Sequence, residues 1–171
     1  MTPNDPTGFA APLGGGHHGR YRGEVTDVDD PKGIGRVRLL VPEVLMDVQS
    51  GWALPAFAVT GDGSGMFAVP PIGAGVWVEF ESGDTARPVW VGGWFAEGAV
   101  PGGATPEQFV LTTPSGHVIV LDDDEGSVTV ADASGAHIVL SSGGIELAKG
   151  GQKVVIGQSS VTINDGALEV R

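Results

Sequence analysis

Short hydrophobic-x-hydrophobic pairs recur through the last third of the chain, separated by turn residues such as Gly, Asn, Asp and Ser. Their starts fall 7 to 10 residues apart. Each pair predicts a strand of about five residues with one apolar face, because side chains alternate between the two faces of a strand. The seven pairs are Ile119/Leu121, Val128/Val130, Ile138/Leu140, Ile145/Leu147, Val154/Ile156, Val161/Ile163 and Leu168/Val170.

These strands are too small to hold a core within one chain. Each contributes two inward side chains, all aliphatic, and the stretch 112–171 contains no aromatic residue. The apolar area that one copy could bury would not offset the entropy lost on ordering the segment. The pattern therefore predicts that the segment obtains its core from identical copies of itself, as a stacked or intertwined β-structure.

The chain before about residue 104 reads as an ordinary small β domain, with all four tryptophans, the one tyrosine and five of the six phenylalanines. Five or six strands in roughly 75 residues favour a small barrel of the OB type; a single sandwich sheet is the alternative. Alternation along Gly75–Phe80 predicts that Trp77 and Glu79 face outward. We expect strands over Arg20–Val28, Gly35–Val41, Trp52–Val59, Phe67–Val69, Gly75–Phe80 and Pro88–Trp94, with a mobile turn over Gly61–Gly65.

Composition marks the domain boundaries. Residues 1–18 are rich in glycine and proline and predict a flexible arm, and 19–96 form the OB-type domain. Residues 97–108 read as a linker, and the strand repeat over 109–171 forms the second domain.

Charge and residue usage narrow the classes of function. Net charge is −12, and no basic stripe is visible, so the sequence predicts no nucleic-acid partner. The absence of cysteine excludes disulfides and a thiolate zinc site. No apolar run reaches the length of a membrane-spanning helix, and the N-terminal stretch lacks a signal-peptide pattern.

Residues that could bind a metal or take part in catalysis are scattered along the sequence. The acidic run Asp122–Glu125 reads as a solvated turn, with calcium binding as the alternative. His117 and His137 begin two repeat strands, where copies around a threefold axis could hold a metal or simply face outward. No nucleophile elbow or phosphate loop is present. The sequence therefore predicts no catalytic, cofactor or metal site.

An ordered series of motifs carries a family resemblance over residues 19–95. Tyr21–Pro31 runs into Gly33–Arg38; Ser50–Ala53, Pro70–Phe80, Gly83–Asp84 and Pro88–Gly93 follow in order. The series resembles the OB domain of phage baseplate assembly protein V and of the Vgr spike proteins of type VI secretion. In that family the OB domain precedes a triple-stranded β-helix, and the repeat after Phe109 looks like such a needle.

The resemblance implies an all-β fold: an OB barrel followed by an intertwined triple-stranded β-helix, with the fourteen paired residues on the axis of a homotrimer. It implies the central spike of a contractile injection system, assembled in the cytoplasm and acting outside the cell on a target membrane. A separate hub protein is expected at the OB end and a PAAR-type tip protein at the other, since the chain has neither a Vgr-type hub region nor a His-x-His tip. A trimeric receptor-binding fibre tip or adhesin is the alternative.

Overall fold

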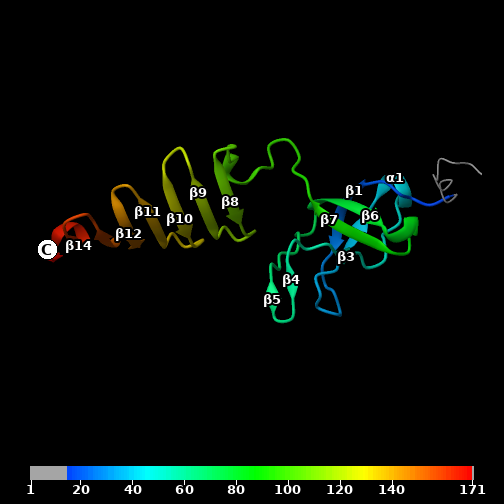
Figure 1. Cartoon of the computed structure of the whole chain (residues 1–171), viewed down its shortest axis with the longest axis horizontal. Coiled ribbons are helices and arrows are strands. Elements are labelled where there is room, and N and C mark those ends of the chain that lie inside the picture. The colour runs from blue at the N-terminus through cyan, green and yellow to red at the C-terminus, as the bar shows by residue number, and fades with distance from the viewer. Residues whose placement is uncertain (1–14, 171) are drawn as a thin grey trace, which may run out of the picture. The chain divides into compact units, whose positions relative to one another are not determined.

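The computed structural model describes residues 15–170, which divide into two compact units between Ala96 and Glu97 (Figure 1). The first unit contains a barrel and the second a single long sheet. Most of the predicted arm, residues 1–14, lies outside the described residues. Its described end contacts the barrel: the backbone N–H of His17 donates to the carbonyl of Gly83 at 3.0 Å, and the His17 ring lies 5.9 Å from that of Tyr21.

The barrel of the first unit is closed. Its sheet has the strand order β2-β1-β6-β7-β3, in which all neighbours are antiparallel except β3 and β7. Val37, directly before β2, and Ala53, directly before β3, exchange two backbone hydrogen bonds of 3.2 and 2.8 Å. These bonds join the two edges of the sheet and close the barrel. The elements are β1 (Tyr21–Asp27), β2 (Arg38–Leu40), α1 (Pro42–Leu45), β3 (Leu54–Pro55), β4 (Thr60–Gly61), β5 (Ser64–Gly65), β6 (Gly75–Phe80), a 3-10 turn (Glu81–Gly83) and β7 (Pro88–Gly93).

One apolar cluster fills this barrel. It arises from alternation: Val76, Val78 and Phe80 of β6 are buried, while Trp77 and Glu79 are half-buried on the other side, as predicted. Trp90 is its largest member and donates its indole N–H to the Gly35 carbonyl at 3.2 Å. The cluster consists of Val25, Val37, Leu39, Val41, Ala53, Val76, Val78, Phe80 and Trp90.

The loops of the barrel differ from the sequence prediction. The strand predicted over Phe67–Val69 is wrong: those residues form a loop in which the Phe67 ring packs 5.4 Å from the Phe57 ring. Pro70 follows directly, and a proline has no N–H to continue a ladder. Two short strands, β4 and β5, instead pair across the predicted turn and make it a hairpin.

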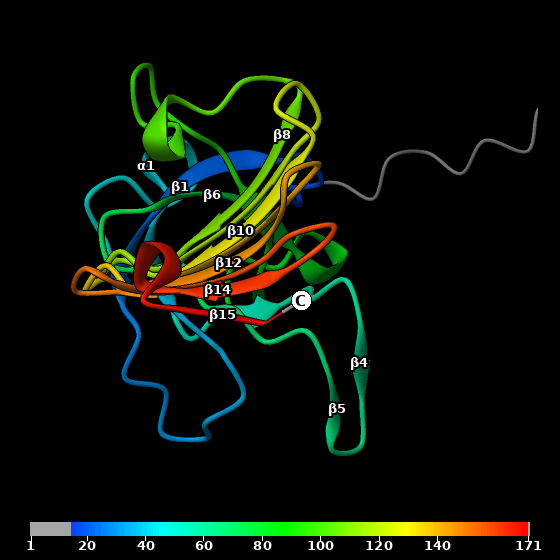
Figure 2. The same cartoon turned by 90° about the vertical axis from the view of Figure 1, so that its left-hand side faces the viewer.

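The second unit is an antiparallel meander in which each strand pairs with its sequence neighbours. Strand direction rotates progressively from β8 to β15 (Figure 2), as expected for a twisted sheet. The all-β class, with an OB-like barrel before a second β unit, is confirmed. The elements are a 3-10 turn (Pro101–Gly103), β8 (Gln108–Thr112), β9 (Val118–Asp122), β10 (Ser127–Ala131), β11 (His137–Ser141), β12 (Gly144–Lys149), β13 (Gln152–Ile156), β14 (Val161–Ile163), a 3-10 turn (Asn164–Gly166) and β15 (Leu168–Val170).

Candidate functional site: an uncovered apolar sheet face

The register of the second unit places the fourteen paired residues on one face of the sheet. Residues directly opposite each other on neighbouring strands share a face, and every pair member lies opposite another pair member. The result is two continuous rows, which we call the apolar files. The first file is Phe109, Leu121, Val128, Leu140, Ile145, Ile156, Val161, Val170; the second is Leu111, Ile119, Val130, Ile138, Leu147, Val154, Ile163, Leu168.

The sequence prediction missed the first pair of residues in the apolar files, which lies on β8. Phe109 lies opposite Leu121, and Leu111 lies opposite Ile119, so β8 supplies an eighth pair. The signal was present as Phe-Val-Leu, another hydrophobic-x-hydrophobic pair, but it adjoins the linker and contains the segment's aromatic residue.

No side chain of the apolar files is buried in a single chain. Leu121 is 46% exposed and Leu168 55%, and the buried cluster of the protein lies entirely in the barrel. A continuous exposed apolar surface of this length marks an interaction site. The files are therefore the strongest functional feature of the described residues.

The opposite face of the sheet is mixed. Its central row contains the polar residues Thr129, Glu146 and Thr162, but valines occupy four further positions. These valines, Val110, Val120, Val139 and Val155, are half-buried. The pair pattern overlooked them because it counted one apolar face per strand.

Carboxylates hold the turns at the ends of the hairpins. Asp122 accepts hydrogen bonds from the Glu125 backbone N–H at 2.9 Å and from the Gln108 side chain at 2.5 Å, and these bonds lower the pKa of Asp122. The Ser134 side chain and the backbone N–H of Ala136 lower the pKa of Asp132 in the same way. Within the acidic run Asp122–Glu125, the first carboxylate thus accepts a hydrogen bond from the backbone of the turn that follows it.

The two histidines of the repeat contact groups on neighbouring segments. His137 lies 3.3 Å from the Glu146 carboxylate through Nε2, and His117 Nδ1 lies 3.4 Å from the Ala133 backbone N–H. Among residues 15–170, no group of three or more His, Cys, Asp or Glu side chains could hold a metal ion. Nor is any helix in this range long and apolar enough to cross a membrane.

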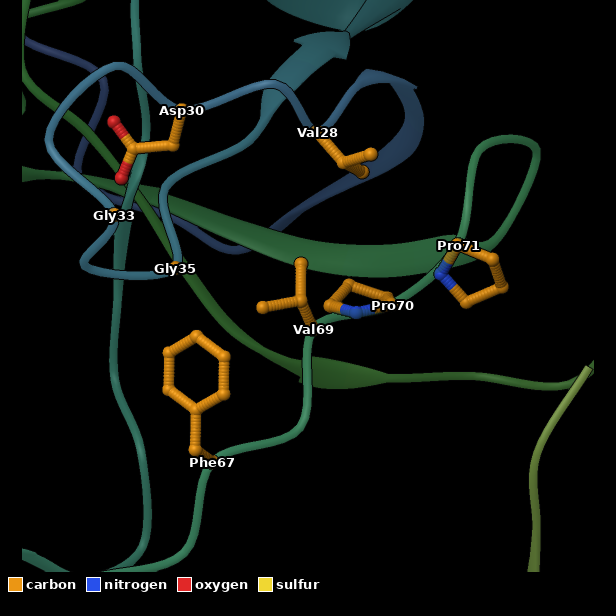
Figure 3. Close-up of a pocket in the computed structure, with 8 residues that line it drawn as sticks. All are labelled: Val28, Asp30, Gly33, Gly35, Phe67, Val69, Pro70 and Pro71. Carbon is orange, nitrogen blue, oxygen red and sulfur yellow. The ribbon is translucent and has the colours of Figure 1, made fainter.

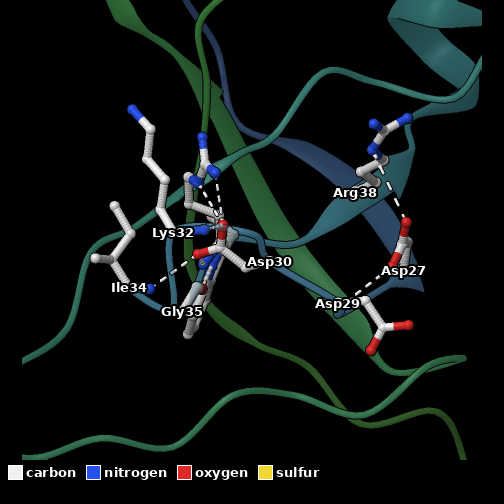
Figure 4. Close-up of polar contacts among 9 residues, drawn as sticks. Asp27, Asp29, Asp30, Lys32, Ile34, Gly35 and Arg38 are labelled. Atoms are coloured by element: carbon white, nitrogen blue, oxygen red, sulfur yellow. Dashed lines mark hydrogen bonds and ion pairs between the residues drawn. The ribbon is translucent and has the colours of Figure 1, made fainter.

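In the barrel, Asp30 organises the loop after β1 (Figure 4). Its carboxylate accepts the backbone N–H groups of Lys32, Ile34 and Arg36 at 3.0, 2.9 and 3.2 Å. It also pairs with the Arg36 guanidinium at 2.5 Å, with both side chains largely shielded from solvent. The guanidinium and these N–H groups hold the pKa of Asp30 well below its usual range.

A small depression adjoins this loop (Figure 3). It has a volume of about 280 Å³ and lies between the loop 28–35 and Phe67, Val69, Pro70 and Pro71. Its titratable side chain is Asp30, whose oxygens already bind Arg36 and backbone N–H groups. The depression is therefore apolar in character and offers no acid–base pair.

Replacing Asp30 with asparagine should destabilise the barrel at pH 7 and flatten its response to acid. A carboxylate with a lowered folded pKa stabilises the fold fully above its unfolded pKa of about 3.9, and this contribution is lost as pH falls below that value. Thermal unfolding followed by tryptophan fluorescence should show a lower midpoint for D30N at pH 7 and a smaller gap from wild type at pH 3. The exposed neighbour variant D29N should match wild type; an unchanged midpoint in D30N would contradict the assignment.

The fold and the uncovered apolar face of the sheet define a class of protein. It is an all-β chain in which an OB-like barrel is followed by a sheet whose apolar face is not covered within a single chain. Residues 21–95 match the family model of the type VI secretion system and phage-baseplate injector OB domain. Residues 108–169 match that of the phage baseplate V C-terminal trimerisation domain. The chain belongs to the phage baseplate V family, and it is a homotrimeric structural component of the baseplate of a virion or tail-like particle. No curated protein matches the chain significantly.

Proposed function

We propose that three copies of this chain form the membrane-puncturing central spike of a contractile injection system: a phage tail, a tailocin or an extracellular injection particle. The uncovered apolar face of β8–β15 carries the proposal, since sixteen aligned aliphatic and aromatic positions in two files give three sheets a common core. In the spike the fourteen predicted residues, joined by Phe109 and Leu111, line the threefold axis of an intertwined β-helix.

The proposed work of the spike is mechanical and needs neither an active site nor a cofactor. Three sheets wrapped together resist bending, because bending breaks many interstrand hydrogen bonds at once. The progressive twist of the sheet suits such wrapping. Contraction of a sheath supplies the work, and the net charge of −12 limits adhesion to anionic lipid during passage.

Each unit would contact a different partner. We assign the barrel to a separate baseplate hub, supported by exposed Met66, Phe67 and Ile72 on its loops. We assign the far end of the sheet to a PAAR-type tip protein, supported by β15, which pairs only with β14 within the described residues. The spike would assemble in the cytoplasm and contact the target membrane transiently outside the cell.

Mass in solution is the first test. Light scattering should give three times the 17.4 kDa of one chain, and a monomer at micromolar concentration would contradict the spike. Electron microscopy of native particles carrying a tagged chain should then place it at the centre of the baseplate. Location on a peripheral fibre would instead identify a receptor-binding tip.

A further inference from the structure

The apolar files contain one aromatic residue, Phe109, which lies in the first of the eight strands. Its side chain is 74% exposed in a single chain, and its neighbour Leu111 is 63% exposed, the two largest values in the files. The remaining positions are all Val, Ile or Leu. Phe109 is thus both the most uncovered and the most distinctive group on the face.

The aliphatic layers repeat closely enough to permit a slip between copies. The files present the same residues at β9 and β11: Leu121 and Leu140 in the first file, Ile119 and Ile138 in the second. Shifting one copy by one hairpin, about 9.6 Å for two strand spacings, would superpose these identical layers. A face with a repetitive pattern specifies register only weakly.

The connection to the barrel does not prevent this slip. β7 ends at Gly93 and β8 begins at Gln108, so residues 94–107 lie between the two units. Trp94 is hydrogen-bonded to Gly75 and Val76 of the barrel, and the Glu107 carbonyl is bonded to Asp123 of the sheet. The twelve residues between these two anchors, 95–106, span up to about 40 Å when fully extended, several times the one-hairpin step. Aligned barrels would therefore be compatible with misaligned sheets.

We propose that Phe109 sets the axial register of the three sheets, an inference that rests on the proposed packing of the files around a threefold axis. Three Phe109 rings meet at one level only when all copies are aligned. In any slipped arrangement a ring faces an aliphatic layer of another strand or projects beyond the shared core. The ring would then lose its aromatic partners and part of its buried area.

The ring is held at a fixed height on its own sheet. Gln108, next to Phe109, donates its side-chain amide to Asp122 at 2.5 Å. The Asp123 backbone N–H donates to the Glu107 carbonyl at 3.1 Å. These contacts hold the edge strand β8 against β9. The Phe109 ring therefore keeps a fixed position relative to the rest of its sheet.

The test measures register directly in assembled trimers. The natural chain has no cysteine, so a spin label can be placed on Ser159→Cys in the exposed turn between β13 and β14. Aligned copies give three equal label-to-label distances, and a slipped copy gives unequal ones. We expect one narrow distance in the labelled parent and in the aliphatic control I138V, and a broad or split distribution in F109L.

A second variant separates register from general loss of burial. F109L/L111F moves the aromatic ring to the other file of the same layer at constant composition, and we expect it to restore the narrow distance. A trimeric F109L with the parent's narrow distance would overturn the proposal while leaving the spike intact, as would an F109L/L111F variant as broad as F109L. Failure of F109L to trimerise would also overturn it, by showing that Phe109 governs assembly. A monomeric parent would instead overturn the spike.

Discussion

Replacing Ile145 with aspartate should abolish the trimer. Ile145 lies in the middle of the first file, directly opposite Leu140 on β11 and Ile156 on β13. On a threefold axis the substitution brings three carboxylates together in an apolar environment, where desolvation and like-charge repulsion both oppose ionisation. Light scattering should show the mass falling from three chains to one at pH 7.

The matched control places the same charge on the other face. Thr129 lies opposite Val139 and Val120 on the other face of the sheet, where it is half-buried, so T129D adds a carboxylate outside the apolar files and should leave the trimer intact. A trimeric I145D would remove the fourteen residues from the axis. Loss of the trimer in both variants would indicate a general effect of added charge on the sheet.

Replacing Trp90 with alanine should cost the barrel about 3–5 kcal/mol, the usual range for removing a buried aromatic side chain. The Trp90 side chain is 6% exposed and its ring contacts Phe57 edge-to-face at 5.3 Å. Its indole N–H also binds the Gly35 carbonyl, which would be left without this donor. A loss of this size is a large fraction of the stability of a small domain.

Denaturant unfolding followed by tryptophan fluorescence checks this prediction, because all four tryptophans lie in the first unit. Three tryptophans remain in W90A to report on the barrel. Phe95 is 65% exposed, so F95A should change the free energy of unfolding by less than about 0.5 kcal/mol. Equal effects of the two substitutions would argue against Trp90 as the centre of the core.

The sequence predicted the second unit closely because its pattern is local. A period-two alternation and frequent turn residues determine which residues share a face, and the antiparallel register then follows from short connections. The β12–β13 hairpin is an example: Ile145 and Leu147 fall opposite Ile156 and Val154 as alternation requires. The axial placement of these residues between copies stays a prediction.

The barrel was less predictable because its key contacts depend on loop geometry. Asp30 resembles an ordinary turn residue before a proline, yet its carboxylate reaches Arg36 across a loop in which Gly33 and Gly35 adopt positive φ. Helix α1 has four residues, too few to show a 3.6-residue period. The error at Phe67 arose because an apolar run near a prolyl pair fits a loop as well as a strand.

In the proposed spike, the stacking of β8 to β15 would make the response to compression differ from the response to tension. Interstrand hydrogen bonds run along the stack, so a push along the shaft shortens spacings of about 4.8 Å and meets atomic repulsion at every layer simultaneously. A pull instead separates strands one at a time, beginning at the edge strand β15, which has one neighbour within the described residues. A spike built in this way should bear compression far better than tension, and it should fail during withdrawal and not during thrust.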